Sequence, residues 1–271
     1  MTTPSPLELL PELQQLAIDA TRSASEGILS GFRSERLAVE TKPDGTPVTL
    51  FDRNAEQQIR TYLAKHQPHP WPVLGEELGD DSKGARYRWV IDPIDGTRSY
   101  ARGLPTFGTL LALEDVVEKR ALVGAMHLPA MNETYSAARG TGAWCNGQRI
   151  HVAQSRPLRQ CMISAPPEHY FRLAGIADSE AQLRAQVPQL RCYADCWAHA
   201  MVARGSLDAV VEFRLARWDI AASEVLIEEA GGSVQIWNAP HAPGKYDWII
   251  GSPTAADEVK KIIRTTPNLN A

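Results

Sequence analysis

The stretch Tyr87-Arg88-Trp89-Val90-Ile91-Asp92-Pro93-Ile94-Asp95-Gly96-Thr97-Arg98 organises the chain. Its apolar, β-prone run, Trp89 to Ile91, leads into two carboxylates three residues apart, with a proline between them and Gly-Thr behind them. This pattern predicts a buried strand that ends at Asp92, with Asp92 and Asp95 in the turn beyond it, where a helix begins. Two carboxylates and several free backbone N–H groups around one point suit divalent cations and phosphate together.

Upstream of this stretch, two further acidic residues stand at the ends of expected elements. Asp52 precedes a helical pattern of apolar residues, so it is predicted at the start of a helix, after a turn-rich loop at residues 41–47. Glu76 follows the short apolar run Trp71-Pro72-Val73-Leu74. Both acids also have a simpler interpretation, because an aspartate at a helix start is a common cap and a single glutamate is often an exposed charge.

The N-terminal half predicts a helix and then a run of strands. Apolar residues recur at helical spacing from Leu9 to Ile28, and Gly31 ends this amphipathic helix. Strands are predicted at 107–113, 121–126 and 133–137, and an Asn-Gly turn at 146–147 joins two shorter ones. Residues 1–150 are therefore predicted to form an α+β domain with an antiparallel sheet.

Beyond residue 150, strands and helices alternate. Strands are predicted at 161–164, 208–212, 233–237 and 248–250, and helices at 195–204, at 218–230 and after the last strand. Such alternation is typical of an α/β arrangement, so residues 151–271 are predicted to form a C-terminal α/β domain. Asp219 stands at the start of the 218–230 helix, where it is either a functional carboxylate or a helix cap.

The composition excludes several classes of function. A chain of 271 residues is long enough for one large domain or two moderate ones. A net charge of -4 argues against a general nucleic-acid or membrane-surface binder, and no run is long enough to span a bilayer. The first residues lack a signal pattern, so the expected location is the cytoplasm. The four cysteines have no C-x-x-C spacing and are expected to be free thiols.

Four acids are candidate metal ligands if their motifs meet in space: Glu76, Asp92, Asp95 and Asp219. Carboxylate oxygens are hard donors that suit Mg²⁺ rather than zinc, and paired Mg²⁺ ions can hold a phosphoryl group and activate a water. The Asp-x-x-Asp spacing differs from the Asp-x-Asp of phosphatases that form an aspartyl phosphate, so we predict direct attack by water. Taken singly, each acid keeps a structural interpretation, because Asp-Pro and Asp-Gly are ordinary turn chemistry.

Three motifs resemble the inositol monophosphatase family of magnesium-dependent phosphomonoesterases. Asp92-Pro93-Ile94-Asp95-Gly96-Thr97 resembles its central metal motif, and Gly75-Glu76-Glu77 resembles its other metal motif. Trp218-Asp219-Ile220-Ala221-Ala222, followed by Glu229-Ala230-Gly231-Gly232, resembles its C-terminal signature. The matches follow the family's order. The resemblance implies a layered αβαβα sandwich of the sugar-phosphatase type, which forms a homodimer.

The resemblance also implies a set of metal ligands. Glu76 and Asp92 would bind one Mg²⁺ together with the carbonyl of Ile94, and Asp92, Asp95 and Asp219 would bind a second. A third, weaker ion would lie near Glu76, which gives two to three ions per site. Glu76 would be a catalytic residue as well as a ligand.

Further roles follow from the same resemblance. Asp52 and Thr97 would be catalytic, because together they would orient and deprotonate the attacking water. The backbone N–H groups of Gly96 and Thr97 would hold phosphate oxygens. Lys42 would lie in a loop near the metals. Phe51 replaces the small residue that the family more often has, and it is expected to crowd the approach to the site.

The substrate is expected to be a small phosphate monoester. Ala194-Asp195-Cys196 resembles the Gly-Asp-Cys of the histidinol-phosphatase branch, which acts in histidine biosynthesis, although Ala194 departs from the glycine. Histidinol phosphate carries groups that can be positively charged, and the carboxylates of Asp195 and Glu212 would attract them. Asp219 is also expected to contact the substrate. The family uses a glutamate at the position of Glu212 for sugar hydroxyls too, and the role of Arg98 stays open.

The sequence therefore leaves three hypotheses for the function of the protein. The first is a histidinol-phosphate phosphatase, and the second is an inositol-1-phosphate or sugar-phosphate phosphatase with the same mechanism. The third is a non-catalytic metal- or ligand-binding protein that kept the fold. The complete acid set argues against the third, because a degenerate relative is expected to lose at least one member.

Overall fold

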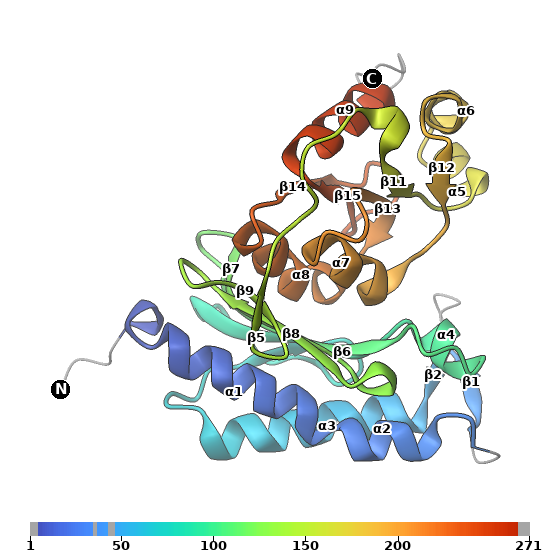
Figure 1. Cartoon of the computed structure of the whole chain (residues 1–271). Helices are drawn as coiled ribbons and strands as arrows, with labels where there is room; N and C mark the ends of the chain where they lie inside the picture. Colours follow the sequence, from blue (N-terminus) through green and yellow to red (C-terminus); the bar gives the residue numbers. More distant parts are fainter. Residues whose placement is uncertain (1–4, 35–36, 43–46, 265–271) are drawn as a thin grey trace.

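The computed structural model describes residues 5–34, 37–42 and 47–264, so part of the predicted loop at 41–47 lies outside the described residues. The described elements stack in five layers that alternate between helices and sheets (Figure 1). This arrangement confirms the αβαβα sandwich. Within the described residues, no helix is long and apolar enough to cross a membrane.

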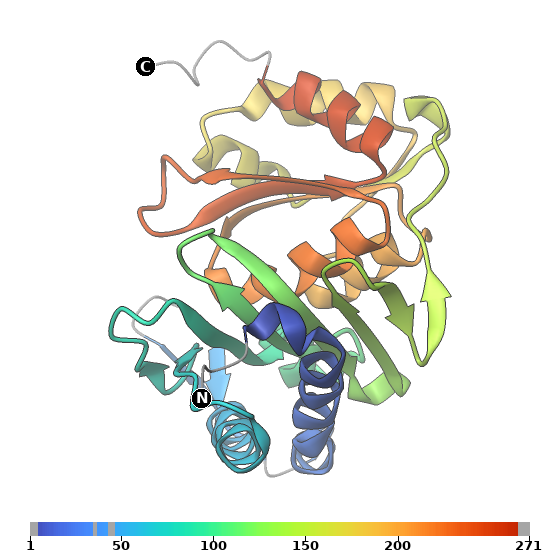
Figure 2. The same ribbon diagram turned by 90° about the vertical axis from the view of Figure 1, so that its left-hand side faces the viewer.

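The first layer consists of α1 (Leu10–Ser23), α2 (Ser25–Gly31) and α3 (Leu50–His66). Figure 2 shows α1 and α3 side by side beneath the first sheet. The prediction of one continuous helix from Leu9 to Ile28 is wrong, because the helix is interrupted at Ala24, between α1 and α2. The Ser23 hydroxyl donates to the carbonyl of Ala20, and such side-chain bonds compete with the backbone at a helix end.

The second layer is an eight-stranded sheet that is mostly antiparallel. Its parallel pair is β3 with β5. Its strands, in spatial order, are β10 (Gln148–Ile150), β9 (Gly142–Cys145), β8 (Glu133–Ala138), β7 (Arg120–Leu128), β6 (Gly108–Asp115), β5 (Tyr87–Asp95), β3 (Val73–Gly75) and β4 (Gly79–Asp80). The run of antiparallel strands from 107 to 150 is confirmed.

Strand β5 continues past the predicted end at Asp92. Its pairing with β6 is interrupted after Asp92 and resumes at Asp95, opposite Gly108. Pro93 has no N–H to donate to the ladder, and its carbonyl accepts from the Thr109 hydroxyl instead. The irregularity therefore places both carboxylates on the strand rather than in a turn beyond it. The short helix α4 (Thr97–Ala101) begins directly afterwards.

The remaining three layers come from the second half of the chain. Helices α7 (Asp195–Ala203) and α8 (Arg217–Glu229) lie between the two sheets (Figure 1). The second sheet has the order β12 (Gln189–Arg191), β11 (Met162–Ser164), β13 (Ala209–Leu215), β15 (Tyr246–Gly251), β14 (Ser233–Asn238). The outer layer contains α5 (Glu168–Leu173), α6 (Ala177–Gln186) and α9 (Pro253–Arg264). A two-stranded ribbon, β1 (Val39–Thr41) with β2 (Pro47–Thr49), precedes α3.

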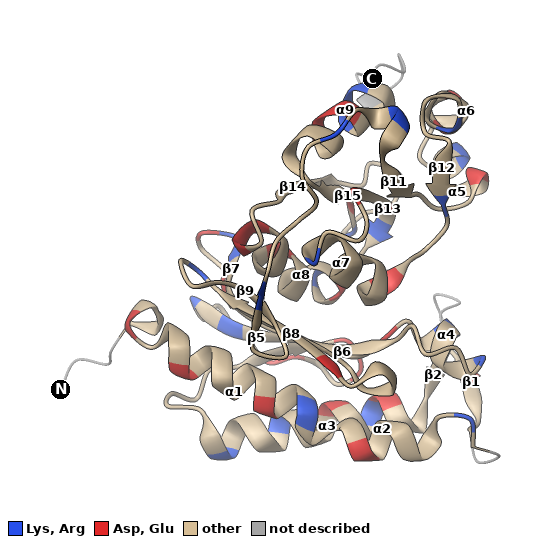
Figure 3. Ribbon diagram, in the orientation of Figure 1, with Lys and Arg blue, Asp and Glu red and all other residues tan. Residues whose placement is uncertain are grey.

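Apolar side chains fill the spaces between layers. One cluster joins the first sheet to α7, α8 and the second sheet, and includes Val90, Leu110, Ile220 and Trp248. Because this cluster joins both halves, the division at residue 150 stays a prediction. Figure 3 shows basic and acidic residues interspersed on outer helices such as α1 and α9. The four cysteines are free, as predicted.

Candidate active site

One cavity of about 160 Å³ gathers most of the predicted site residues. Eight of the ten line it: Glu76, Asp92, Ile94, Asp95, Gly96, Thr97, Asp195 and Asp219. Pro47, Arg98, His199 and Leu215 line it as well. The two predicted residues that do not line it are Asp52 and Glu212, which lie behind its wall. Motifs that are up to 143 positions apart in the sequence (Glu76 to Asp219) therefore meet at one point.

The sheet and two helix starts bring these acids together. Strand β3 runs parallel to β5 with Gly75 beside Ile91, and the Glu76 N–H donates to the Ile91 carbonyl at 3.2 Å. Glu76 therefore follows β3 next to the Asp92 end of β5. At the start of α7, the Cys196 N–H donates to Asp95 Oδ2 at 2.5 Å. The first turn of α8 carries Asp219.

Asp219 is both a helix cap and a cavity residue. Its Oδ2 accepts the Ala216 N–H at 2.7 Å, as a cap does. The same carboxylate lines the cavity, so the two interpretations of the sequence apply together. The cap fixes the orientation of the side chain, because one oxygen is tied to the backbone of its own helix start.

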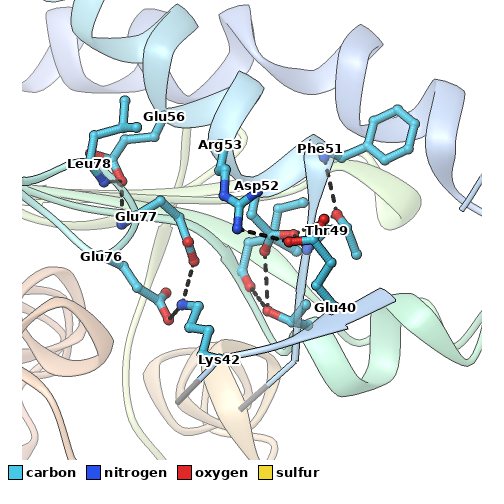
Figure 4. Close-up of polar contacts among 12 residues, drawn as sticks. Glu40, Lys42, Thr49, Phe51, Asp52, Arg53, Glu56, Glu76, Glu77 and Leu78 are labelled. Carbon is cyan, nitrogen blue, oxygen red and sulfur yellow. Dashed lines mark hydrogen bonds and ion pairs between the residues drawn. The ribbon is translucent and has the colours of Figure 1, made fainter. Parts of the chain in front are cut away.

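Asp52 is likewise a cap, on α3, and it contacts a cavity residue rather than lining the cavity itself. Its Oδ2 accepts from the Thr49 N–H at 2.8 Å and from the Thr49 hydroxyl at 2.6 Å, which completes a capping box. Its Oδ1 lies 3.3 Å from Thr97 Oγ1, and that hydroxyl is also 2.9 Å from the Ile94 carbonyl. The Phe51 ring points away from Asp52 and packs against Tyr100 (Figure 4). The expected crowding by Phe51 is not found, because Phe51 does not line the cavity.

Glu212 is occupied by protein donors. Its Oε1 accepts the Asp195 N–H at 3.1 Å, and its Oε2 accepts from Trp248 Nε1 at 3.0 Å and lies 2.6 Å from His199 Nε2. Glu212 thereby holds the first residue of α7, Asp195, whose φ of 61° is in the left-handed region. The Asp195 carboxylate lines the cavity, whereas Glu212 supports it from behind.

Acidic side chains outnumber basic ones in the cavity lining, with five carboxyl groups and one arginine, Arg98. Burial, followed by repulsion from Glu76, Asp95 and Asp219, raises the pKa of Asp92 well above its usual range. Burial and the Asp195 and Asp219 charges do the same to the pKa of Asp95. Burial raises the pKa of Asp219 to about 7. Carboxylates that repel one another in a buried site gain most from a bound cation.

Burial also raises the pKa of two carboxyl groups beside the metal-ligand candidates. The pKa of Asp195 rises to about 6 through burial and the neighbouring Glu212 charge. The pKa of Asp52 rises through burial, against the hydrogen bonds from Thr49 that lower it. A carboxylate with a raised pKa is a better proton acceptor at neutral pH. Asp52 is therefore suited to accept a proton through Thr97.

The donor set fits a hard divalent cation. Asp92 Oδ1 is buried and has no hydrogen-bond partner among the described residues, so it is available as a ligand. Within residues 5–34, 37–42 and 47–264, however, no three His, Cys, Asp or Glu side chains already form a ready-made ligand shell. The fit therefore rests on the all-oxygen chemistry and the free Asp92 oxygen rather than on preformed coordination geometry.

Some cavity residues were not foreseen from the sequence. His199 lines the cavity and is four residues after Asp195, a spacing that places both on one face of the predicted helix. That spacing could have identified it.

Lys42 lies at the site as expected, with its Nζ 2.7 Å from Glu76 Oε1 and 2.5 Å from Glu77 Oε1 (Figure 4).

The sequence is similar to those of known phosphatases. The chain is 36% identical over 224 residues to a histidinol-phosphatase of Chlorobaculum parvum, and the alignment covers 83% of this chain and 85% of the relative. It is 31% identical to a fructose-1,6-bisphosphatase/inositol-1-monophosphatase of Aquifex aeolicus, over 95% of this chain and 97% of the relative.

A solved structure shows the same fold. The extragenic suppressor protein suhB of Bartonella henselae superposes with a TM-score of 0.83 at 26% identity, over 94% of this chain and 99% of that protein. The sequence also matches the inositol monophosphatase family over residues 9–268. Because this match spans nearly the whole chain, the protein belongs to the inositol monophosphatase family.

Proposed function

We propose that this phosphoric monoester hydrolase is Mg²⁺-dependent and acts on histidinol phosphate. The observation that carries the proposal is the single cavity lined by Glu76, Asp92, Asp95 and Asp219, with the Asp52–Thr97 pair at its wall. Acids that are buried together without enough cationic partners are suited to divalent metal ions. The similarity to histidinol-phosphatases supports the choice of substrate.

In this proposal the metal ligands divide between two principal Mg²⁺ sites. Glu76, Asp92 and the Ile94 carbonyl would hold one ion, and Asp92, Asp95 and Asp219 would hold the other. A third ion near Glu76 would compete with the Lys42 ammonium, which lies 2.7 Å from Glu76 Oε1. When bound, Mg²⁺ would neutralise the phosphoryl charge and make water more acidic.

The residues of the chain would orient water and phosphate. The Thr97 hydroxyl can donate to Asp52 Oδ1 or to the Ile94 carbonyl, so it can pass a proton from water toward Asp52. Gly96 has a φ of 82° and precedes the first turn of α4, where N–H groups have no intrahelical partner. The N–H groups of Gly96 and Thr97 would therefore bind phosphate oxygens.

The cation of histidinol phosphate would meet Asp195. Among the described residues, no side-chain donor bonds the Asp195 carboxylate, and that carboxylate lines the cavity beside Gly96. Glu212 would act mainly by holding Asp195, because its oxygens already accept protein donors. This division suits a small cationic alcohol as the leaving group.

The second candidate is inositol-1-phosphate or a sugar phosphate, hydrolysed in the same way. The Aquifex aeolicus relative, named for both fructose-1,6-bisphosphate and inositol-1-phosphate, favours it. The His199 ring and Asp195 would then face sugar hydroxyls instead of a cation. A homodimer and a cytoplasmic location stay predictions.

Phosphate release tests the proposal. Histidinol phosphate, inositol 1-phosphate and fructose 1,6-bisphosphate are compared side by side, with Mg²⁺ and after chelation. We expect Mg²⁺-dependent release with the highest kcat/KM for histidinol phosphate. A preference for inositol 1-phosphate would keep the chemistry and reject the substrate. Release that chelation leaves unchanged would reject the metal-dependent mechanism.

A further inference from the structure

A fully buried glutamate on α3 has no assigned role. Glu56 has no exposed surface and lies one helical turn after Asp52. It does not line the cavity. An ionised side chain in such a position is unfavourable unless hydrogen bonds compensate for the lost hydration, so the partners of Glu56 indicate what it does.

Those partners belong to the turn that carries Glu76. Glu56 Oε2 accepts the Glu77 N–H at 2.7 Å, and both of its oxygens lie 3.3 Å from the Leu78 nitrogen. Figure 4 shows the Glu56 side chain directed at this backbone. These two N–H groups follow the end of β3. The carboxylate therefore binds the part of the turn that the strand no longer holds.

Glu56 approaches Gly75 so closely that only glycine fits at position 75. A Cβ at Gly75 would lie 1.8 Å from Glu56 Oε1, which no side chain could tolerate without displacing the carboxylate. Gly75 is thus required by Glu56, and not by its own backbone conformation. The glycine of the Gly75-Glu76-Glu77 motif makes room for a carboxylate from another element.

Arg60 completes the arrangement one turn further along α3. Its Nε donates to Glu56 Oε1 at 2.8 Å, and its Nη2 donates to the Gly79 carbonyl at 2.7 Å. The pair therefore holds Glu77, Leu78 and Gly79, the part of the segment 75–79 that follows Glu76. On its other side, Glu76 is tied to β5 through the Ile91 carbonyl. The position of Glu76 is thus fixed between the strand that carries Asp92 and the helix that carries Asp52.

We propose that Glu56 is a positioning residue, which holds the 75–79 turn so that Glu76 faces the cavity and thereby sets the affinity for Mg²⁺. The inference rests on the proposed role of Glu76 as a metal ligand. Groups that hydrogen-bond behind a ligand typically change metal affinity about 10- to 100-fold when they are altered. A merely structural role would lower stability without changing the metal affinity.

The test is Glu56→Gln in the full chain. Glutamine replaces one acceptor oxygen by an NH₂ group and leaves the volume unchanged, so either the Glu77 N–H or the Arg60 Nε–H then faces a donor and the hold on the turn is weakened. The half-saturating Mg²⁺ concentration is measured from the Mg²⁺-dependent rise in unfolding temperature and, separately, from phosphate release. We expect about a tenfold increase in both, with kcat at saturating Mg²⁺ close to that of the unaltered protein.

Glu180→Gln is the matched control. Glu180 is also a buried glutamate, bonded by the arginine four residues later at 2.9 Å, but it lies on α6 away from the cavity. Its half-saturating Mg²⁺ concentration is expected to stay that of the unaltered protein. A Glu56→Gln protein that loses stability as the control does, with unchanged Mg²⁺ affinity, would overturn the inference and leave the proposed function intact.

Two other outcomes are informative. If Glu56→Gln does not fold, Arg60→Gln is measured instead, because it removes the donor to Glu56 and the tie to Gly79. A weaker Mg²⁺ response is expected, and an unchanged one would overturn the inference. If the unaltered protein itself shows no Mg²⁺ response, the proposed function fails, and this inference fails with it.

Discussion

Two groups of buried acids in this protein differ in their neighbours: one lies among other carboxylates, and the other lies among arginines. Asp92 and Asp95, in the cavity, lie next to further carboxylates, and their pKa values are raised by burial and mutual repulsion. Glu114 and Glu224 are as buried as the aspartates, but both meet Arg217, at 2.6 and 2.7 Å.

The second group is completed by two more arginines. Arg88 Nε lies 2.9 Å from Glu114, and Arg139 Nη2 lies 3.4 Å from Glu224. This network joins β5, β6 and Arg139, the residue directly after β8, to α8, and its three arginines offset the two buried glutamates. Because both groups are buried, burial of an acid does not by itself indicate function. The lack of such partners in the cavity supports the proposal that the cavity acids bind a cation from outside.

The largest expected effect is on catalysis. Asp92→Asn keeps the shape of the side chain and removes a proposed ligand of both metal ions. Loss of several kcal/mol of transition-state stabilisation should lower kcat/KM by about a thousandfold or more, measured as phosphate release at saturating Mg²⁺. Turnover within tenfold of the unaltered protein, in a folded variant, would remove the cavity acids from the mechanism.

The next effect is on stability, in the compensated group. Arg217→Met leaves Glu114 and Glu224 buried without their shared partner, so the free energy of unfolding should fall by about 3 kcal/mol in urea. Arg172→Met is the matched control, because the Arg172–Glu168 pair on α5 is exposed and should contribute under about 1 kcal/mol. Equal losses in the two variants would contradict the contrast drawn above.

A buried histidine supplies a smaller, pH-dependent effect. Burial, with a contribution from Arg22, lowers the pKa of His127 to about 4, below its unfolded value near 6.5. The neutral ring therefore stabilises the fold fully above about pH 6.5, and this stability is lost as the pH falls toward 4. Between about pH 7.5 and pH 5, His127→Gln should lose about 2 kcal/mol less stability than the unaltered protein. Parallel pH profiles in urea denaturation would refute this.

Most of the sheet architecture could be predicted because its strands have strong local patterns. The segment 107–150 contains apolar, β-prone runs separated by turn residues, and all the strands predicted there formed. The segment 165–191 lacks such a pattern. The residues that α6 buries include Ser179 and Glu180, and the Ser179 hydroxyl reaches the Ile262 carbonyl on α9. Tertiary contacts therefore decide this region, and α5, α6 and β12 were not foreseen.

In the candidate site too, residues in local motifs could be predicted, and residues that depend on tertiary contacts could not. The metal-ligand candidates were found because they belong to short contiguous motifs, such as Asp92-Pro93-Ile94-Asp95. The supporting residues were not, because each acts across the fold. Glu56 meets a turn 21 positions away, and His199 meets a glutamate 13 positions away. The role of Glu212 as a direct substrate contact stays a prediction, and its protein donors were not foreseen because they come from other elements.

The most direct test of the account is urea unfolding of the unaltered protein and of Asp92→Asn, each with Mg²⁺ and with chelator. In chelator, Asp92→Asn should be the more stable protein, because one of the mutually repelling buried charges is gone. In Mg²⁺ at about a hundred times its dissociation constant, the unaltered protein should gain about 2.7 kcal/mol and become the more stable one. Asp92→Asn less stable than the unaltered protein in chelator, with no Mg²⁺ stabilisation of either, would contradict the claim that these acids await a cation.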